Sequence, residues 1–260
     1  MSGTEDSVGT VDTGAPVPGR TGAALSGVAV ALGCVLFLGA FAWGALVYRP
    51  YTVPTASMAP TLGTGDRVLA QRIDGEQVRR GDVVVFHQAA WGDLPMVKRV
   101  VAVGGDTVAC CTDGRLTVNG TALDESYLAP AQAASVTSIP STTVPDDGLF
   151  LLGDARAGSL DSAAHLQSAG GGAVPRSAVV ARVDAVVWPV DGALARPAVF
   201  AALPGGVSEP GPLRPLLSAA VLGTVLVLGG AAYGPLARRV ARRRKGTAAP
   251  EGTGEPAGTG

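Results

Sequence analysis

Two long apolar stretches without a charged residue stand near the two ends of the chain. The first covers residues 21–48 and the second covers residues 215–237. Each exceeds the roughly 20 residues that an α-helix needs to cross the hydrocarbon core of a bilayer. Trp43 and Tyr48 stand where aromatic side chains meet a membrane interface. The pattern predicts two transmembrane helices, at 21–48 and 214–237.

The first stretch has a rival interpretation as a cleaved signal peptide. Its apolar run is too long for the hydrophobic region of a signal peptide, and a polar tail of about 20 residues precedes it. The sequence therefore favours an anchor that remains on the protein.

Basic residues predict how the chain is oriented in the membrane. Six arginines and lysines fall within residues 238–245, directly after the second stretch. Such residues are retained on the cytoplasmic side, so both termini are predicted inside and residues 49–213 outside. The tail 1–20 and the end of segment 238–260 are rich in Gly, Thr, Pro and Glu and are predicted to be disordered cytoplasmic tails.

The segment between the spans has the pattern of a mainly β, antiparallel domain. Short β-branched runs alternate with turn residues, and no apolar stripe of helical period is long enough for a core helix. Asn119-Gly120 follows one run and predicts a tight hairpin. Segment 129–147 reads as a long loop or small insertion. The expected strands are Arg67–Ile73, Asp82–His87, Met96–Val103, Arg115–Val118, Leu149–Leu152 and Val179–Trp188.

Composition excludes several classes of function. The chain is 47% hydrophobic with a mean hydropathy of +0.32, which is high for a water-soluble domain, and a net charge of −1 gives no electrostatic case for binding nucleic acid. Three cysteines cannot form a disulfide framework. Because there are only two histidines, we expect no metal, and nothing in the sequence calls for a cofactor.

Two side chains in the exterior segment stand in positions suited to chemistry. Ser57 lies between Pro54 and Pro60, which stiffen the backbone around it, although a plain linker would have the same appearance. Lys98 lies within an apolar strand, where burial disfavours the charged ammonium. Lowering a lysine pKa from ~10.4 to ~7 requires roughly 4–5 kcal/mol, within the range documented for buried lysines. Such a lysine could act as a base.

Five sequence blocks in order resemble the bacterial type I signal peptidases, which are membrane-anchored Ser-Lys endopeptidases. They are PTASMAPTL, GDRV, RGDVVVF, VKRVVAVGGD and GDARAGSLDS, following the N-terminal anchor. The resemblance covers about residues 49–190 and implies a signal-peptidase-like antiparallel β catalytic domain.

The resemblance also implies roles for individual residues. Ser57 would be the nucleophile and Lys98 the neutral general base. The Thr55 hydroxyl and the Ser57 backbone N–H would form the oxyanion hole, and Ser159 would orient Lys98. The residues implied to support that loop are Gly153, Asp154, Asp161 and Ser162.

The implied reaction removes signal peptides from secretory preproteins after small residues in an Ala-x-Ala pattern. Lys98 would take the Ser57 proton, protonate the departing amine, and then activate water against the acyl-enzyme. The implied partners are preproteins and the lipid bilayer, with a secretion translocon also expected.

The last block departs from the family pattern at two positions. Ala155 stands where the family has asparagine, and Ala163 stands where it has arginine, so Asp161 loses its expected partner there. The Ser-Lys pair is intact. A specialised or weakly active paralogue remains an alternative.

Two other classes of function compete with the peptidase. A sortase-like transpeptidase would use Cys110 or Cys111 as nucleophile with His87 or His165. A non-catalytic, membrane-tethered binding domain would use Ser57 and Lys98 only structurally. Whether the adjacent cysteines form a disulfide is left open, Cys34 is expected to pack within the first span, and both histidines are expected to be ordinary solvated or hydrogen-bonded side chains.

Overall fold

A computed structural model describes residues 19–92, 94–112, 114–133, 138–168 and 170–246 of the chain. The chain divides into two compact units, one from residues 1–41 with 216–260 and the other from residues 42–215. Predictions that concern residues 1–18 and 247–260, including the disorder of the two tails, fall outside the described residues.

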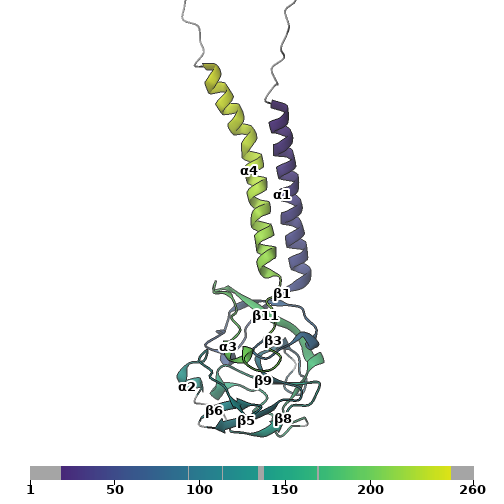
Figure 1. Cartoon of the computed structure of the whole chain (residues 1–260), viewed down its shortest axis with the longest axis vertical. Helices are drawn as coiled ribbons and strands as arrows, with labels where there is room; N and C mark the ends of the chain where they lie inside the picture. The colour runs from purple at the N-terminus through teal and green to yellow at the C-terminus, as the bar shows by residue number, and fades with distance from the viewer. Residues whose placement is uncertain (1–18, 93, 113, 134–137, 169, 247–260) are drawn as a thin grey trace, which may run out of the picture. The chain divides into compact units, whose positions relative to one another are not determined.

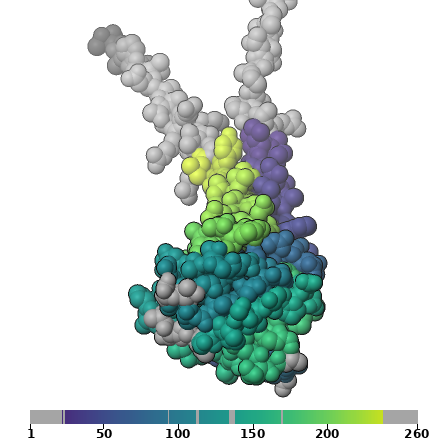
Figure 2. Space-filling view, turned by 60° about the horizontal axis from the view of Figure 1, so that its bottom comes forward, coloured from purple at the N-terminus to yellow at the C-terminus, as the bar shows by residue number. Residues whose placement is uncertain are grey.

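The first unit is a pair of long helices, α1 (Gly19–Val47) and α4 (Leu213–Gly246) (Figure 1). Each contains a segment apolar and long enough to cross a membrane, at Ala24–Val47 and Leu213–Leu236. Small residues let the backbones approach: a Cβ added at Gly33 would lie 2.7 Å from the Gly223 carbonyl oxygen. The atoms of the two helices are in direct contact in the space-filling view (Figure 2).

The described part of α1 and α4 also forms a polar contact in this pair. Ser26 Oγ donates to the Gly230 carbonyl oxygen over 2.7 Å. The basic run at residues 238–245 continues α4 as helix instead of leaving it as a loop. Tyr48, expected at the end of the first span, is the first residue of strand β1.

The second unit is built around an antiparallel sheet in the order β1-β2-β11-β3-β4-β9-β10, with β12 pairing with β11. The order alternates segments distant in sequence, so the sheet brings the N-terminal, central and C-terminal parts of the unit together. The strands are β1 (Tyr48–Thr52), β2 (Arg67–Gln71), β3 (Val83–Phe86), β4 (Met96–Val103), β9 (Gly148–Leu152), β10 (Val174–Pro175), β11 (Val179–Trp188) and β12 (Gly192–Ala193).

A second, four-stranded sheet has the order β7-β6-β5-β8. Its strands are β5 (Thr107–Thr112), β6 (Arg115–Val118), β7 (Thr121–Ala122) and β8 (Ile139–Thr143). Val118 pairs with Thr121 across a two-residue turn, in which Asn119 and Gly120 both have positive φ. This is the tight hairpin that the Asn-Gly pair predicts.

The prediction of a mainly antiparallel β domain is confirmed. Segment 129–147, expected to be a loop or insertion, instead contains the short helix α2 (Pro130–Ala133) and strand β8, although its residues 134–137 are outside the described structure. Strand β8 has a polar sequence, IPSTT, and its place in a sheet depends on pairing with β5. Local composition could not reveal that pairing.

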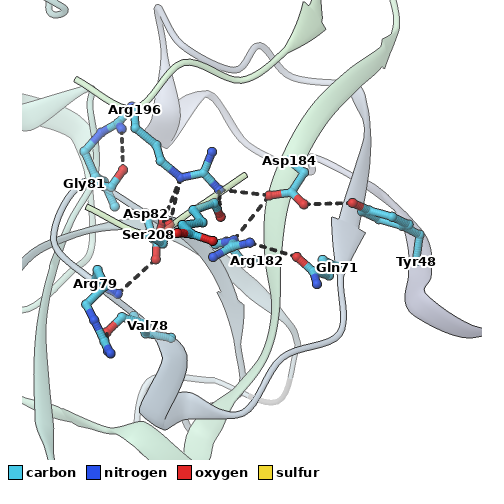
Figure 3. Close-up of polar contacts among 12 residues, drawn as sticks. Tyr48, Gln71, Val78, Arg79, Gly81, Asp82, Arg182, Asp184, Arg196 and Ser208 are labelled. Atoms are coloured by element: carbon cyan, nitrogen blue, oxygen red, sulfur yellow. Dashed lines mark hydrogen bonds and ion pairs between the residues drawn. The ribbon is translucent and has the colours of Figure 1, made fainter. Parts of the chain in front are cut away.

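A buried polar network ties the strands to the segment before α4 (Figure 3). Asp184 on β11 accepts from the Tyr48 hydroxyl at 3.0 Å and from Arg196 Nη2 at 3.1 Å. Arg196 Nε also donates to Ser208 Oγ over 2.7 Å, and Ser208 donates to Asp82. Because Tyr48 begins the first strand of the unit and Ser208 lies near the end of the unit, this network joins both ends of the domain.

Candidate active site

Ser57 lies in a single 3₁₀ turn, η1 (Ala56–Met58), between the stiffening prolines. Met58 is fully buried in the turn, which fixes the turn to the core and leaves Ser57 half-buried. Thr55 precedes the turn in extended conformation, and its hydroxyl donates to Ser57 Oγ over 3.2 Å. The predicted nucleophile and its predicted oxyanion-hole partner are therefore neighbours on one rigid segment.

Lys98 reaches Ser57 from β4, in the middle of the eight-stranded sheet. Its backbone pairs with Val84 on β3, and the residue is 5% exposed. Nζ lies 2.6 Å from Ser57 Oγ, within hydrogen-bond distance. The ammonium form donates to Oγ, and in the neutral form the nitrogen lone pair can accept the Ser57 hydroxyl proton at the same distance.

The environment of Lys98 favours the neutral amine. Burial lowers the pKa of Lys98 below that of a free lysine, and this desolvation is the dominant influence. The carboxylates of Asp161 and Asp154 act in the opposite direction and raise the pKa. Burial prevails, so a larger share of Lys98 is available as a base near neutral pH than for a solvated lysine.

A loop that follows β9, here called the catalytic loop (residues 153–162), completes the site. The Ala155 backbone N–H donates to the Ser57 carbonyl oxygen over 3.1 Å, so the loop is bonded directly to the serine turn. Gly153 packs against the Ser57 carbonyl and the Ser159 side chain, where a Cβ atom would not fit. The contact of Ala155 uses only backbone, which explains why the loop does not need asparagine at this position to reach Ser57.

Asp161 and Ser162 close the base of the catalytic loop. The Asp161 carboxylate accepts from the Gly153 N–H at 2.9 Å and from the Ala163 N–H at 3.1 Å. Ser162 and Leu151 bond each other twice, through Ser162 Oγ at 2.8 Å and through the Ser162 N–H at 3.0 Å. Both residues are buried. Their hydrogen bonds hold the two ends of the loop together, and their supporting role in catalysis stays a prediction.

Ser159 lies in the catalytic loop with a buried hydroxyl. Its Oγ has no hydrogen-bond partner among the described residues, and therefore none with Lys98. An unpaired buried hydroxyl is costly, and a group that can rotate toward a partner removes the cost. The predicted lysine-orienting role of Ser159 stays a prediction.

Asp154, at the start of the catalytic loop, is fully buried and forms a bidentate pair with Arg99. Arg99 is the residue after Lys98 on β4 and is 1% exposed. The two hydrogen bonds are 2.9 Å and 2.7 Å long, and Thr61 donates to the same carboxylate. The Tyr127 ring lies 4.6 Å from the Arg99 guanidinium. This pair bonds the strand that carries Lys98 to the loop that carries Ser159.

Arg156 makes a second link from the catalytic loop to the rest of the domain. Its Nε donates to the Gly153 carbonyl oxygen over 3.0 Å, and its guanidinium forms a buried ion pair with Glu125. Sequence reasoning missed Arg99, Arg156 and Glu125. Arg99 and Arg156 stand inside the blocks that carry the family resemblance, whereas Glu125 carries no local signal because its partner is 31 positions away.

The competing candidates lie apart from the Ser57–Lys98 pair. Cys110 and Cys111 are joined to each other by a disulfide on β5, in the smaller sheet. His87 is exposed at the end of β3, and His165 contacts the Asp161 backbone. Among the described residues no group of three or more His, Cys, Asp or Glu side chains could hold a metal ion.

Comparison with known proteins identifies the family to which this chain belongs. The family model described as "Signal peptidase, peptidase S26" matches residues 25–188. Signal peptidase I of Mycobacterium tuberculosis is 34% identical over 193 residues, which cover 55% of this chain and 66% of that enzyme. Signal peptidase I of Bacillus caldolyticus is 34% identical over 156 residues, covering 55% of this chain and 81% of the enzyme.

Among solved structures, a signal peptidase I from Enterococcus faecalis V583 aligns at 27% sequence identity with a TM-score of 0.33, over 45% of this chain and 96% of that chain. The match of the family model to residues 25–188 defines the class as the serine endopeptidases of family S26. The chain belongs to the signal peptidase family, as its sequence blocks indicate.

Proposed function

We propose that this protein is a signal peptidase I that cleaves secretory preproteins with a Ser57–Lys98 dyad. The observation that carries the proposal is the 2.6 Å approach of Lys98 Nζ to Ser57 Oγ, made by a lysine whose pKa is lowered by burial. A buried amine beside a serine hydroxyl is the arrangement that activates a serine nucleophile without histidine.

The proposed reaction has two halves. Neutral Lys98 takes the proton as Ser57 Oγ bonds to the scissile carbonyl carbon, and the Thr55 hydroxyl with the Ser57 N–H stabilises the oxyanion. The C–N bond then breaks and the Lys98 ammonium protonates the departing amine. Water, deprotonated by Lys98, hydrolyses the acyl-enzyme and releases the signal peptide. Ser159, by rotation of its hydroxyl, orients Lys98 in this proposal.

The proposed substrates are preproteins with small residues one and three positions before the cut. The two candidate membrane helices support a membrane-anchored enzyme acting on substrates held in the same bilayer. The basic end of α4 supports an orientation with both termini in the cytoplasm and residues 49–213 outside. A secretion translocon would deliver the preproteins.

The test uses the full chain purified in detergent or lipid with a preprotein carrying an Ala-x-Ala site. Wild type, Ser57→Ala and Lys98→Ala are compared by the mass of the product, with Ser168→Ala, at an exposed serine, as the matched control. We expect cleavage after the small residue by wild type and the control, and no cleavage by the two variants. Cleavage that survives Ser57→Ala would contradict the proposal.

Two further outcomes would separate the alternatives. Absence of cleavage by folded wild type across several preproteins would favour a specialised paralogue or a binding domain. Activity lost in Cys110→Ser/Cys111→Ser but retained in Ser57→Ala would favour a cysteine transpeptidase. The disulfide between these two cysteines argues against that use, because neither is then a free thiolate.

A further inference from the structure

This inference concerns the contacts that hold the C-terminal end of the catalytic loop, near Asp161. Asp161 is 3% exposed, and its carboxylate takes part in no ion pair among the described residues, since Ala163 provides no cation. Its two backbone hydrogen bonds, to the Gly153 and Ala163 N–H groups, lie within the loop and its flank. They close the loop on itself, and Ser162 attaches the end of the loop to Leu151 of β9.

The Asp161 backbone carbonyl makes a further attachment. It accepts the Ala164 N–H at 3.1 Å and lies 2.8 Å from His165 Nδ1. A carbonyl oxygen only accepts, so Nδ1 must carry the proton and donate. The His165 imidazole is half-buried and thus bonded to the backbone of the residue that closes the loop.

The His165 ring is itself held in place by Trp91. The two rings are stacked, with centroids 4.3 Å apart and planes 11° from parallel. Trp91 belongs to the connection between β3 and β4, and its ring meets Phe86 of β3 edge-on at 5.8 Å. Phe86 is fully buried. The contacts therefore run from a core side chain of β3 through two aromatic rings to Asp161.

These aromatic contacts begin on β3, the strand that pairs with the Lys98 strand β4. Phe86 stands two positions after Val84, which pairs with Lys98 across β3 and β4. Strand β4 thus contributes Lys98 to the site, and the connection that precedes it contributes, through Trp91, a support for the loop.

We propose that His165, held flat by Trp91, is a positioning residue that fixes the catalytic loop behind Lys98. His165 touches no reacting atom and acts through Asp161 and the neighbouring Ser159. This inference rests on the proposed peptidase function of the same site.

The experiment measures kcat and KM of the full chain with a preprotein for His165→Ala, His165→Asn and the control His87→Asn. We expect His165→Ala to lower kcat about tenfold, as for the loss of one well-placed hydrogen bond, with KM within about twofold. His165→Asn should recover most of the loss, because its amide nitrogen can take the place of Nδ1. The exposed His87 should tolerate asparagine. Unchanged kcat in His165→Ala, or no recovery in His165→Asn, would overturn the proposal.

A double-mutant cycle with Trp91→Leu tests whether the two rings act as one device. We expect Trp91→Leu to lower kcat and the double variant Trp91→Leu/His165→Ala to be no slower than His165→Ala alone. Additive losses would overturn the coupled role of Trp91.

Amide hydrogen exchange separates this inference from the proposed function, since it needs no activity. In His165→Ala we expect faster exchange at Ala163 and Ala164, with the strand amides of β4 unchanged. Loss of protection throughout the domain would mean general unfolding and would overturn a positioning role. If the wild type had no peptidase activity but His165→Ala still showed this local change in exchange, the proposed function would be rejected and the positioning of the loop by His165 would stand.

Discussion

The two sides of the candidate site are fixed by different means. Lys98 lies on β4, whose backbone is paired with β3 on one side and β9 on the other. The catalytic loop has no such ladder and depends on single side chains, chiefly Asp161, Ser162 and Arg156. A strand ladder is formed by backbone groups and tolerates most side chains, whereas the loop is held by backbone hydrogen bonds to Ser57 and Leu151 and otherwise by individual side chains. The two positions at which the sequence is expected to depart from the family pattern, Ala155 and Ala163, lie in this loop and directly after it.

The role of Lys98, on the strand side of the site, can be tested by Lys98→Arg. Arginine keeps the positive charge and remains protonated, so it cannot accept the Ser57 proton. We expect preprotein cleavage to fall by at least about 10³-fold, the contribution of a general base, while near-ultraviolet circular dichroism shows a folded domain. A folded arginine variant within tenfold of wild type would mean that Lys98 is not the base.

The link between the two sides can be broken by Arg99→Met, which leaves Asp154 buried without its cation. We expect a loss of about 3–5 kcal/mol in the free energy of unfolding, measured by denaturant titration of the full chain in detergent. The double variant Arg99→Met/Asp154→Leu removes both charges and should recover much of that loss. Equal stability of the single and double variants would show that the pair is not what joins strand to loop.

The serine segment can be tested by Thr55→Val, which keeps the shape of the side chain and removes its hydroxyl. We expect kcat to fall about 100-fold with little change in KM, as when an oxyanion-hole donor is removed. Thr55→Ser retains the hydroxyl and serves as the control. If the Thr55→Val and Thr55→Ser variants had the same kcat, the Thr55 hydroxyl would have no part in stabilising the oxyanion.

On the loop side, the influence of the Asp161 carboxylate on Lys98 can be tested by Ala163→Arg, for which we expect the smallest effect. A cavity of about 270 Å³ lined by Ala163, Ser159 and Asp161 offers room for the longer side chain. Asp161 raises the pKa of Lys98, so a guanidinium that neutralises this carboxylate should lower that pKa. The acidic limb of kcat/KM should then move to lower pH. Gln167→Arg, at an exposed position outside the lining of the cavity, should leave it in place, and an identical shift in both variants would argue against a local effect.

Much of the architecture could be predicted from local patterns. Apolar runs and their flanking charges predict two membrane spans, and short β-branched runs predict strands such as Met96–Val103 with the bounds that the structure has. β8 escaped prediction because its sequence is polar and its conformation depends on pairing with β5. A strand of that kind is stabilised by its neighbours rather than by its own composition.

Within the site, too, some features depend on the local sequence and others on contacts between distant segments. The sequence by itself determined the residue types, namely a serine between prolines and a lysine in an apolar strand, because these depend on neighbours within a few positions. The family resemblance implied that Lys98 serves Ser57, and the tertiary structure gives their contact across 41 positions. Only the tertiary structure decided that Arg99 and Asp154 pair across 55 positions and that Trp91 stacks on His165. Such contacts depend on the order in which the strands pair, and that order is set by burial of the whole domain.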